Sequence, residues 1–173
     1  MRITICTVCP QDFTSFAHTH VVQRAQSLGL LDLVVSDIRR FAGGSFRHID
    51  DSPYGGGTGM ILRLAPMLDC MDAAGTGRRI LLSPAGRRYD RNAAHRLSRE
   101  DSLIFLCGHY EGVDARVCAH VDEEISLGDF VLTSGELAAQ VICDSIIRLL
   151  PGVVRDTATE SFEGPEGLPE YPQ

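Results

Sequence analysis

Residues 102–112 read Ser-Leu-Ile-Phe-Leu-Cys-Gly-His-Tyr-Glu-Gly. The first part, 102–108, is a continuous apolar run, which is typical of a central strand in a parallel sheet that is covered on both faces. Glycine and polar residues follow this run at once. Because ligands of parallel α/β sheets bind beyond the carboxyl ends of the strands, we expect 108–112 to form part of a binding site.

Strand-like and helix-like patterns alternate on both sides of this strand. Apolar, β-branched runs predict strands, and apolar residues three or four positions apart predict helices. Strands are expected at 2–8, 30–36, 79–83, 102–108 and 123–127, and helices at 12–28, 64–74, 90–99, 113–121 and 133–150. This alternation predicts an α/β domain with a mainly parallel sheet and ligand loops at its carboxyl edge. The loops at 83–86 and 127–130 would lie at that edge together with 108–112.

Two local signals set boundaries in this scheme. Pro84 is expected to end the strand at 79–83. Thr133 and Glu136 have the spacing of a capping box, in which Thr133 is the N-cap and Glu136 reaches back to it. This pair predicts where the last and longest helix begins.

The composition indicates one soluble globular domain and excludes several enzyme classes. The chain has 173 residues, of which 44% are hydrophobic and 23% charged. All 16 basic residues are Arg, and there is no Lys. A Walker A phosphate loop, a pyridoxal Schiff base and a protein kinase site each need a Lys, so these classes are excluded.

Charge is unevenly distributed along the chain. The formal net charge is −7, and the segment 156–173 carries five acidic residues and no basic one. We expect 1–155 to be the folded domain and 156–173 to be a flexible acidic tail or linker. Seven arginines gather within 78–99, which is typical either of a phosphate-binding patch or of a solvated helix face with loop charges.

The cysteines and the N-terminus indicate a reducing compartment. Several of the six cysteines lie inside apolar runs, as buried free thiols do. The N-terminal apolar run is too short for a signal peptide, and no segment has the length of a membrane span. We therefore expect a cytoplasmic protein.

A few residues are candidates for chemistry, each with a structural alternative. Cys6 and Cys9 with His18 and His20 resemble a zinc set, but on a strand and a helix these side chains would point apart. The glycine-rich run 55–59 either approaches a ligand or is a surface loop.

The sequence leaves two roles open for each of three charged residues. Glu111 either binds ligand hydroxyls or caps the next helix. Arg148 either compensates a helix dipole or stabilises an oxyanion. Glu160 is either a solvated carboxylate or a functional one.

Several longer motifs occur in a fixed order, and together they indicate a family that none of the motifs would indicate alone. They are Pro-Tyr-Gly-Gly-Gly-Thr-Gly-Met (53–60), Leu-Ser-Pro-Ala-Gly-Arg (82–87), Cys-Gly-His-Tyr-Glu-Gly-Val-Asp-Ala-Arg-Val (107–117), Ser-Leu-Gly-Asp-Phe-Val-Leu (126–132), Gly-Glu-Leu (135–137) and Asp-Ser-Ile-Ile-Arg-Leu-Leu-Pro-Gly-Val (144–153). Over nearly its whole length, the chain closely resembles the catalytic domain of the bacterial tRNA (guanine-N1)-methyltransferases of the TrmD type.

The resemblance implies a fold, a cofactor and an assembly. The fold is a SPOUT-type α/β fold, with a mainly parallel sheet, helices on both faces and a deep trefoil knot. The assembly is a homodimer with a shared active site, and the cofactor is S-adenosyl-L-methionine. The cofactor-binding residues implied are Leu81, Leu82, Ser83, Pro84, Gly108, Tyr110, Glu111, Gly112, Ser126, Leu127, Gly128, Asp129, Phe130, Val131, Leu132 and Gly135. No residue is assigned to a metal.

The resemblance also implies the reaction, which is methylation of guanine 37 beside the tRNA anticodon at N1. Arg148 would stabilise negative charge on O6, and Glu160 would remove the N1 proton. The residues implied to lie against the flipped-out guanine are Tyr54, Gly55, Gly56, Gly57 and Gly59. The alternative function is a non-catalytic module that binds RNA through the 78–99 arginines or zinc through Cys6, Cys9, His18 and His20.

The chain departs from the family pattern at several positions. Glu160 stands where Asp is usual, His109 where Arg is common, Ser134 where Gly is common and Ala138 where Pro is common. The sequence stops at Gln173, where the family continues into a helical, more basic tRNA-binding domain. We therefore expect a chain that binds the methyl donor but methylates tRNA weakly or not at all.

Overall fold

The protein is built on one five-stranded parallel sheet. The computed structural model describes residues 1–43 and 48–154. Within them the strand order is β2-β1-β6-β5-β7, and every neighbouring pair is parallel. The strands are β1 (Arg2–Thr7), β2 (Asp32–Asp37), β5 (Arg78–Arg88), β6 (Ser102–Cys107) and β7 (Glu123–Ser126). The predicted α/β domain with a mainly parallel sheet is confirmed.

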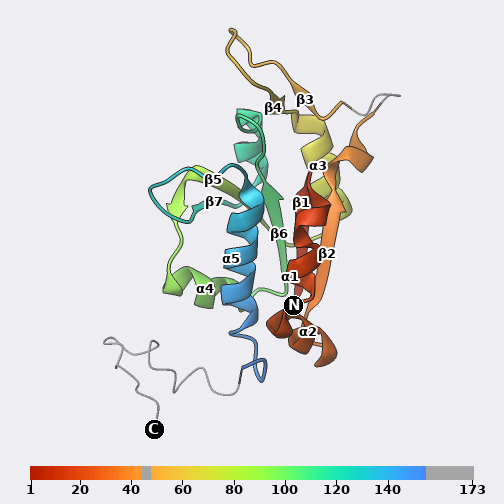
Figure 1. The fold of residues 1–173 in the computed structure, drawn as a ribbon, viewed down its shortest axis with the longest axis vertical. Coiled ribbons are helices and arrows are strands. Elements are labelled where there is room, and N and C mark those ends of the chain that lie inside the picture. The colour runs from red at the N-terminus through yellow and green to blue at the C-terminus, as the bar shows by residue number, and fades with distance from the viewer. Residues whose placement is uncertain (44–47, 155–173) are drawn as a thin grey trace.

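Strand β6 lies at the centre of the sheet and is buried on both faces, as its apolar run predicts (Figure 1). Its side chains alternate between two hydrophobic cores, because successive residues of a strand point to opposite faces. Leu103 and Phe105 belong to one core, and Ile104 and Leu106 belong to the other.

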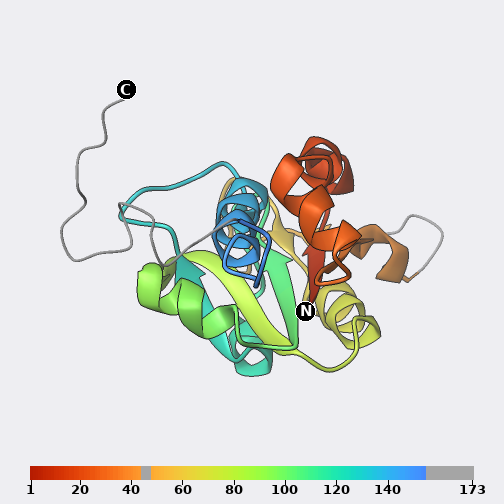
Figure 2. The same ribbon diagram turned by 90° about the horizontal axis from the view of Figure 1, so that it is seen from below.

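Helices cover both faces, so the domain has three layers (Figure 2). The first core also contains residues of α1 (Thr14–Ala17), α2 (His20–Ser27), α4 (Arg91–Leu97) and α5 (Gly135–Ile147). The second core contains residues of α3 (Leu64–Ala73) and of the 3-10 turns η2 (Ile38–Phe41) and η3 (Ala115–His120). None of the helices in the described parts of the chain is long and apolar enough to cross a membrane.

A short antiparallel pair, β3 (Asp50–Asp51) and β4 (Ile61–Leu62), projects beyond the sheet (Figure 1). Its second strand is tied to the loop that follows β6. The Leu62 N–H donates to the Gly112 carbonyl at 3.0 Å, and the Asp114 N–H donates to the Leu62 carbonyl at 2.9 Å. The glycine-rich run that β3 and β4 flank is thereby attached to the predicted binding edge.

The helix expected at 12–28 is wrong as one element. The structure has a 3-10 turn η1 (Pro10–Phe13), then α1, and then α2. Thr19 between the helices is extended, and its hydroxyl donates to the Phe16 carbonyl, while the His18 ring contacts the Thr14 carbonyl. These side chains compete with the backbone for helical carbonyls, so the helix ends there.

Strand β5 does not end at Pro84, against expectation. It continues to Arg88 and changes register against β7 between Leu82 and Arg87. Gly86 allows this, because a Cβ there would lie 2.6 Å from the backbone of Glu124 and Ile125. A proline is tolerated at such an irregularity, where the ladder needs no N–H from it.

The capping box is also wrong. Ser134 is the N-cap of α5 and makes no hydrogen bond with its side chain, and Glu136 turns inward to Thr7. The 113–121 segment forms η3, a 3-10 turn that Asp114 caps through the Arg116 N–H, instead of an α-helix. The expected elements at 30–36, 64–74, 90–99 and 123–127 are confirmed to within two residues. The trefoil knot stays a prediction.

We predict that Gly135→Ala lowers stability by about 1–3 kcal/mol through overpacking. A Cβ at Gly135 would lie 2.9 Å from both Cys107 Cα and the Gly108 nitrogen, so α5 would have to shift away from β6. Gly43→Ala is the control, because its Cβ would meet nothing within 4 Å. Chemical denaturation of both variants measures the difference; equal stabilities would contradict this account of the α5–β6 contact.

Candidate active site

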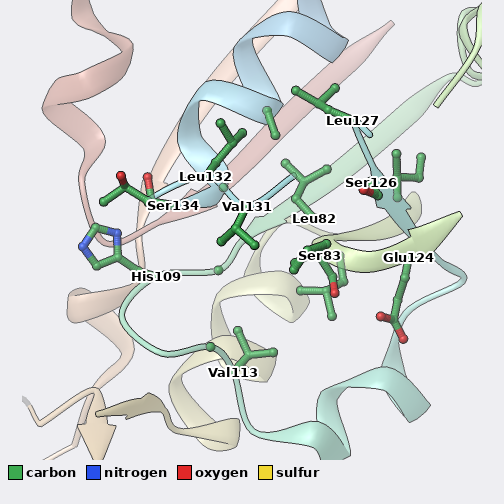
Figure 3. A pocket seen from close by; sticks show the side chains of 18 of the residues that line it. Leu82, Ser83, His109, Val113, Glu124, Ser126, Leu127, Val131, Leu132 and Ser134 are labelled. Carbon is green, nitrogen blue, oxygen red and sulfur yellow. The ribbon is translucent and has the colours of Figure 1, made fainter. Parts of the chain in front are cut away.

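A cavity of about 440 Å³ opens at the carboxyl edge of β5, β6 and β7 (Figure 3). It lies beside the register shift of β5 and the ends of β6 and β7, close to the expected place for a ligand in this class of sheet. Its size is within the range of small-molecule sites. The residues that line it belong to β5, to the loop after β6, to β7 with the loop after it, and to the first turns of η3 and α5.

Most of the predicted cofactor residues line this cavity. Those that do are Leu81, Leu82, Ser83, Pro84, Gly108, Tyr110, Glu111, Gly112, Ser126, Leu127, Phe130, Val131, Leu132 and Gly135. Gly128 and Asp129 do not, although the Gly128 carbonyl accepts a hydrogen bond from the buried Ser126 hydroxyl at 2.9 Å and so shapes the turn. The structure thus brings the three predicted loops together, and their binding role remains a prediction.

Other residues that line the cavity were not among the predicted cofactor residues. They are His109, Val113, Ala115, Cys118, Glu124, Ile125, Thr133, Ser134 and Ala138. In Figure 3, His109 and Ser134 lie on one side of the cavity and Glu124 on the other. Glu124 was missed because it lies before the end of its strand, and only the loops after strand ends were expected to bind a ligand. Thr133 and Ser134 were missed because the segment that begins at Thr133 was predicted to be a capped helix. The sequence did draw attention to His109, because it stands where Arg is common in the family.

A direct backbone contact holds two sides of the cavity together. The Gly135 N–H at the start of α5 donates to the Gly108 carbonyl at the end of β6, at 2.8 Å. The N-cap side chain leaves this first-turn amide unsatisfied, so the neighbouring loop supplies the acceptor. The helix start therefore has a fixed place beside the 108–112 loop.

Tyr110 has a strained backbone. Its φ is +59°, and among the described residues it is the non-glycine residue with positive φ. Such a conformation costs on the order of 1 kcal/mol and persists where the surroundings impose it, most often at functional sites. The Tyr110 ring packs edge-on against His109, with 4.8 Å between the ring centroids.

The charges around the cavity restrict what it can bind. Two carboxylates line it, Glu111 and Glu124, and no Arg does in the described parts of the chain. A hydrogen bond with Glu124, followed by burial, raises the pKa of Cys118, so that thiol stays protonated and adds no charge at neutral pH. The remaining lining is largely apolar. This cavity favours a ligand that is cationic and partly apolar over one that carries phosphates.

The glycine-rich run reaches the cavity through Gly59. Its φ is +94°, and a Cβ at this position would lie 2.2 Å from Cγ of Glu111. Beside it, the Glu111 N–H donates to the Met60 carbonyl at 3.1 Å. Gly55, Gly56 and Gly57 also have positive φ, and the Tyr54 side chain is fully exposed. The run therefore borders the cavity at one glycine and leaves the other residues facing outward.

Of the two predicted catalytic residues, the structure describes Arg148, which lies outside the cavity of its own chain. Arg148 is the C-cap of α5, whereas the cavity lies at the helix start. Thirteen helical residues span roughly 20 Å at about 1.5 Å per residue, so Arg148 cannot reach a ligand in that cavity. Glu160 and the proposed linker 156–173 lie outside the described residues.

The alternative zinc set of the sequence analysis is not assembled. Cys6 is fully buried and contacts Cys70, whereas His18 and His20 are exposed. Cys9 lies instead beside two residues that were not in that set, His109 and Glu136. The free thiols are confirmed, and four of the six are buried.

The arginine cluster is partly neutralised by acidic partners. Arg78 and Arg96 both pair with Glu123, at 2.7 and 2.8 Å, and Arg79 pairs with Asp72 at 2.6 Å. Burial raises the pKa of Glu123, but hydrogen bonds from the two arginines outweigh it and hold this pKa below its ordinary value. These pairs favour the structural reading of the cluster over a phosphate-binding patch.

The fold and the cavity define an α/β domain with a cavity of small-molecule size at the carboxyl edge of a parallel sheet. Comparison with known proteins identifies the family. The whole chain, 1–173, matches the family described as tRNA (Guanine-1)-methyltransferase TrmD. It is 48% identical over 176 residues to the tRNA (guanine-N(1)-)-methyltransferase of Streptococcus agalactiae, covering 100% of this chain and 70% of that protein.

Two further proteins agree with this match. The tRNA (guanine-N(1)-)-methyltransferase of Limosilactobacillus fermentum is 45% identical over 184 residues, with 100% of this chain and 72% of that protein covered. A crystal structure of the tRNA (m1G37) methyltransferase of Aquifex aeolicus superposes with a TM-score of 0.83 at 31% identity, covering 98% of this chain and 80% of that one. The chain therefore belongs to the tRNA (guanine-1)-methyltransferase family, and the resemblance is confirmed.

We predict that Gly59→Ala loosens the contact between the glycine-rich run and the 108–112 loop. The new methyl group would clash with Glu111, so the Glu111 amide should lose its protection from hydrogen exchange, by about tenfold or more. Gly55→Ala is the matched control, because it has a similar φ of +90° and a Cβ there meets nothing within 4 Å. Equal protection in the two variants would contradict this contact.

Proposed function

We propose that this chain transfers a methyl group from S-adenosyl-L-methionine to N1 of guanine 37 in tRNA. Membership of the tRNA (guanine-1)-methyltransferase family supports the reaction. The observation that carries the choice of donor is the charge of the cavity, which is lined by two carboxylates and, in the part of the chain that the structure describes, by no guanidinium. A sulfonium nucleoside is cationic and partly apolar, so it suits this lining, whereas a nucleoside triphosphate does not.

The residues present fit this donor. Leu82, Val131 and Leu132 offer apolar surface for a purine ring, and the glycines of the 108–112 loop let backbone polar groups approach closely. Glu111 and Glu124 offer carboxylates for ribose hydroxyls and for positive charge. When bound, the donor supplies an electrophilic methyl group on sulfur. The chain then holds that group in place and excludes water from it.

The acceptor needs an acid–base function that this chain's sequence supplies. Guanine N1 carries a proton and becomes nucleophilic as the proton leaves. We assign Glu160 as the general base that takes this proton, by sequence, since it lies outside the described residues. Negative charge that develops on O6 is stabilised by the guanidinium of Arg148. The exposed run 54–59, which borders the cavity at Gly59, is our candidate contact for the flipped guanine.

The position of Arg148 supports a homodimeric site. Because Arg148 and the cavity lie at opposite ends of α5, one chain does not bring donor and guanidinium together. The outer face of α5 exposes Leu137 and Val141, one turn apart, with 59% and 53% of their surfaces accessible. We propose that α5 packs against a second copy, so that each cavity is completed by the Arg148 of the other chain.

The remaining assignments follow from this function. We assign 1–155 to the donor-binding SPOUT domain and 156–173 to an acidic linker that carries Glu160. The anticodon stem-loop of tRNA is the proposed macromolecular substrate. A tRNA-modifying enzyme with this composition is expected in the cytoplasm.

We predict that Val131→Arg weakens binding of S-adenosyl-L-methionine by about tenfold, because a cation would enter a cavity suited to a cationic ligand. Leu28→Arg, at an exposed apolar residue outside the cavity lining, should leave binding unchanged. Calorimetric titration of the three proteins with the donor and with ATP measures this effect. Tighter binding of ATP than of the donor by the unsubstituted chain would contradict the proposal.

We predict that Arg148→Ala abolishes the slow methylation expected of the unsubstituted chain and leaves donor binding intact, because its guanidinium acts on O6 of the guanine and not on the donor. Mixing this variant with Val131→Arg, at a donor concentration near the Kd of the unsubstituted chain, should give more methylation than the sum of the two variants assayed alone, since half of the random dimers are mixed and each of these has one site with both an intact cavity and an intact Arg148. Single-turnover assays with protein in excess over tRNA measure this, and size-exclusion chromatography verifies the dimers. A mixture no more active than that sum would exclude a shared site.

A further inference from the structure

Three metal-capable side chains from distant parts of the sequence meet beside the cavity. Cys9 follows β1, His109 follows β6, and Glu136 lies in the first turn of α5. One potential ligand atom from each lies within 4.8 Å of the other two. Sulfur, imidazole nitrogen and carboxylate oxygen are the donor types that zinc takes in proteins.

Hydrogen bonds from Thr7 hold two of these residues in place. The Thr7 hydroxyl donates to Oε1 of Glu136 at 2.6 Å and accepts the Cys9 N–H at 2.8 Å. Thr7 is fully buried, and Glu136 is 1% exposed. One carboxylate oxygen of Glu136 is thereby occupied, and the other, Oε2, is left for a ligand. Partners of this kind orient metal-binding groups in known sites.

Two polar atoms at the centre of this cluster have no hydrogen-bond partner within residues 1–43 and 48–154. They are Oε2 of Glu136 and Nδ1 of His109, both buried and 3.7 Å apart. A buried carboxylate oxygen without a partner is costly. A cation bound between these two atoms would give the carboxylate oxygen a partner.

We propose that Cys9, His109 and Glu136 bind a divalent zinc-class cation. Binding forms the metal–sulfur bond as the Cys9 S–H bond breaks, and the thiol proton passes to the buffer, so no oxidant or reductant is needed. Ligand atoms around a tetrahedral zinc ion stand roughly 3.5 Å apart, so the cluster closes by about 1 Å through side-chain rotation. Water fills the fourth position. Magnesium and calcium are disfavoured because both prefer oxygen ligands.

The site joins the cavity to β1. His109 lies between Gly108 and Tyr110 in the loop that lines the cavity, and Glu136 follows Gly135. A bound cation would therefore fix the strained Tyr110 loop against α5 and the end of β1. Any effect of the bound cation on donor binding would rest on the proposed function. The metal site itself does not rest on it, because zinc binding is measured without any donor.

The test is zinc binding by the chelator-treated full chain, measured by competition with a chromophoric chelator. We expect one zinc ion per chain, and Co²⁺ in its place should show a thiolate-to-cobalt charge-transfer band. Cys9→Ser and His109→Arg should each weaken zinc binding by about 100-fold. Arg at 109 keeps a cation beside Glu136 but cannot ligate a metal, so this variant separates metal binding from simple charge compensation.

Two control variants should keep the unsubstituted affinity. Cys118→Ser removes an exposed thiol, and His20→Ala removes an exposed histidine from the zinc set first considered in the sequence. Circular dichroism verifies that all four variants fold. The proposal is overturned if zinc binds only weakly at millimolar concentration, if Cys9→Ser or His109→Arg binds as tightly as the unsubstituted chain, or if a control variant loses the metal. Those results would leave His109 and Glu136 as a close side-chain pair that binds no metal.

Discussion

The hydrogen bond from the Gly135 N–H to the Gly108 carbonyl is the contact on which the site depends. It brings the start of the longest helix against the end of the central strand with no space for a side chain between them. The loops after β6 and β7 and the first turn of α5 can enclose one cavity only because of this approach. The glycine at 135 serves close packing, since its φ is not among the positive values of the chain.

Much of the fold follows from local patterns. The apolar run of β6 is long, uninterrupted and flanked by glycine, so its central place could be predicted from residues 102–108 alone. The errors occurred where a long-range contact decides the local structure. Thr133 and Glu136 have the spacing of a capping box, but Thr7, far away in sequence, offers Glu136 a buried hydrogen bond that wins. Pro84 reads as a strand end, yet β7 continues to pair beyond it.

The candidate site was predictable in its loops and not in its assembly. Strand ends and ordered motifs identify segments such as 108–112 and 126–132, because each is contiguous in sequence. Glu124 and the Cys9–His109–Glu136 cluster join residues that no sequence spacing connects, so they required the structure. Arg148 is the opposite case. Its sequence motif is clear, but only the structure shows that the length of α5 separates Arg148 from the cavity.

The central claim is that a sulfonium nucleoside occupies the cavity between residues 81–84 of β5 and the loops that follow β6 and β7. A crystal structure of this chain grown with S-adenosyl-L-methionine tests it most directly. The account predicts density for the donor in that cavity, with its purine against Leu82 and Leu132 and with Glu111 or Glu124 in contact with a polar group of the donor. A donor bound elsewhere, or a cavity that stays without density at saturating donor concentration, would contradict the account.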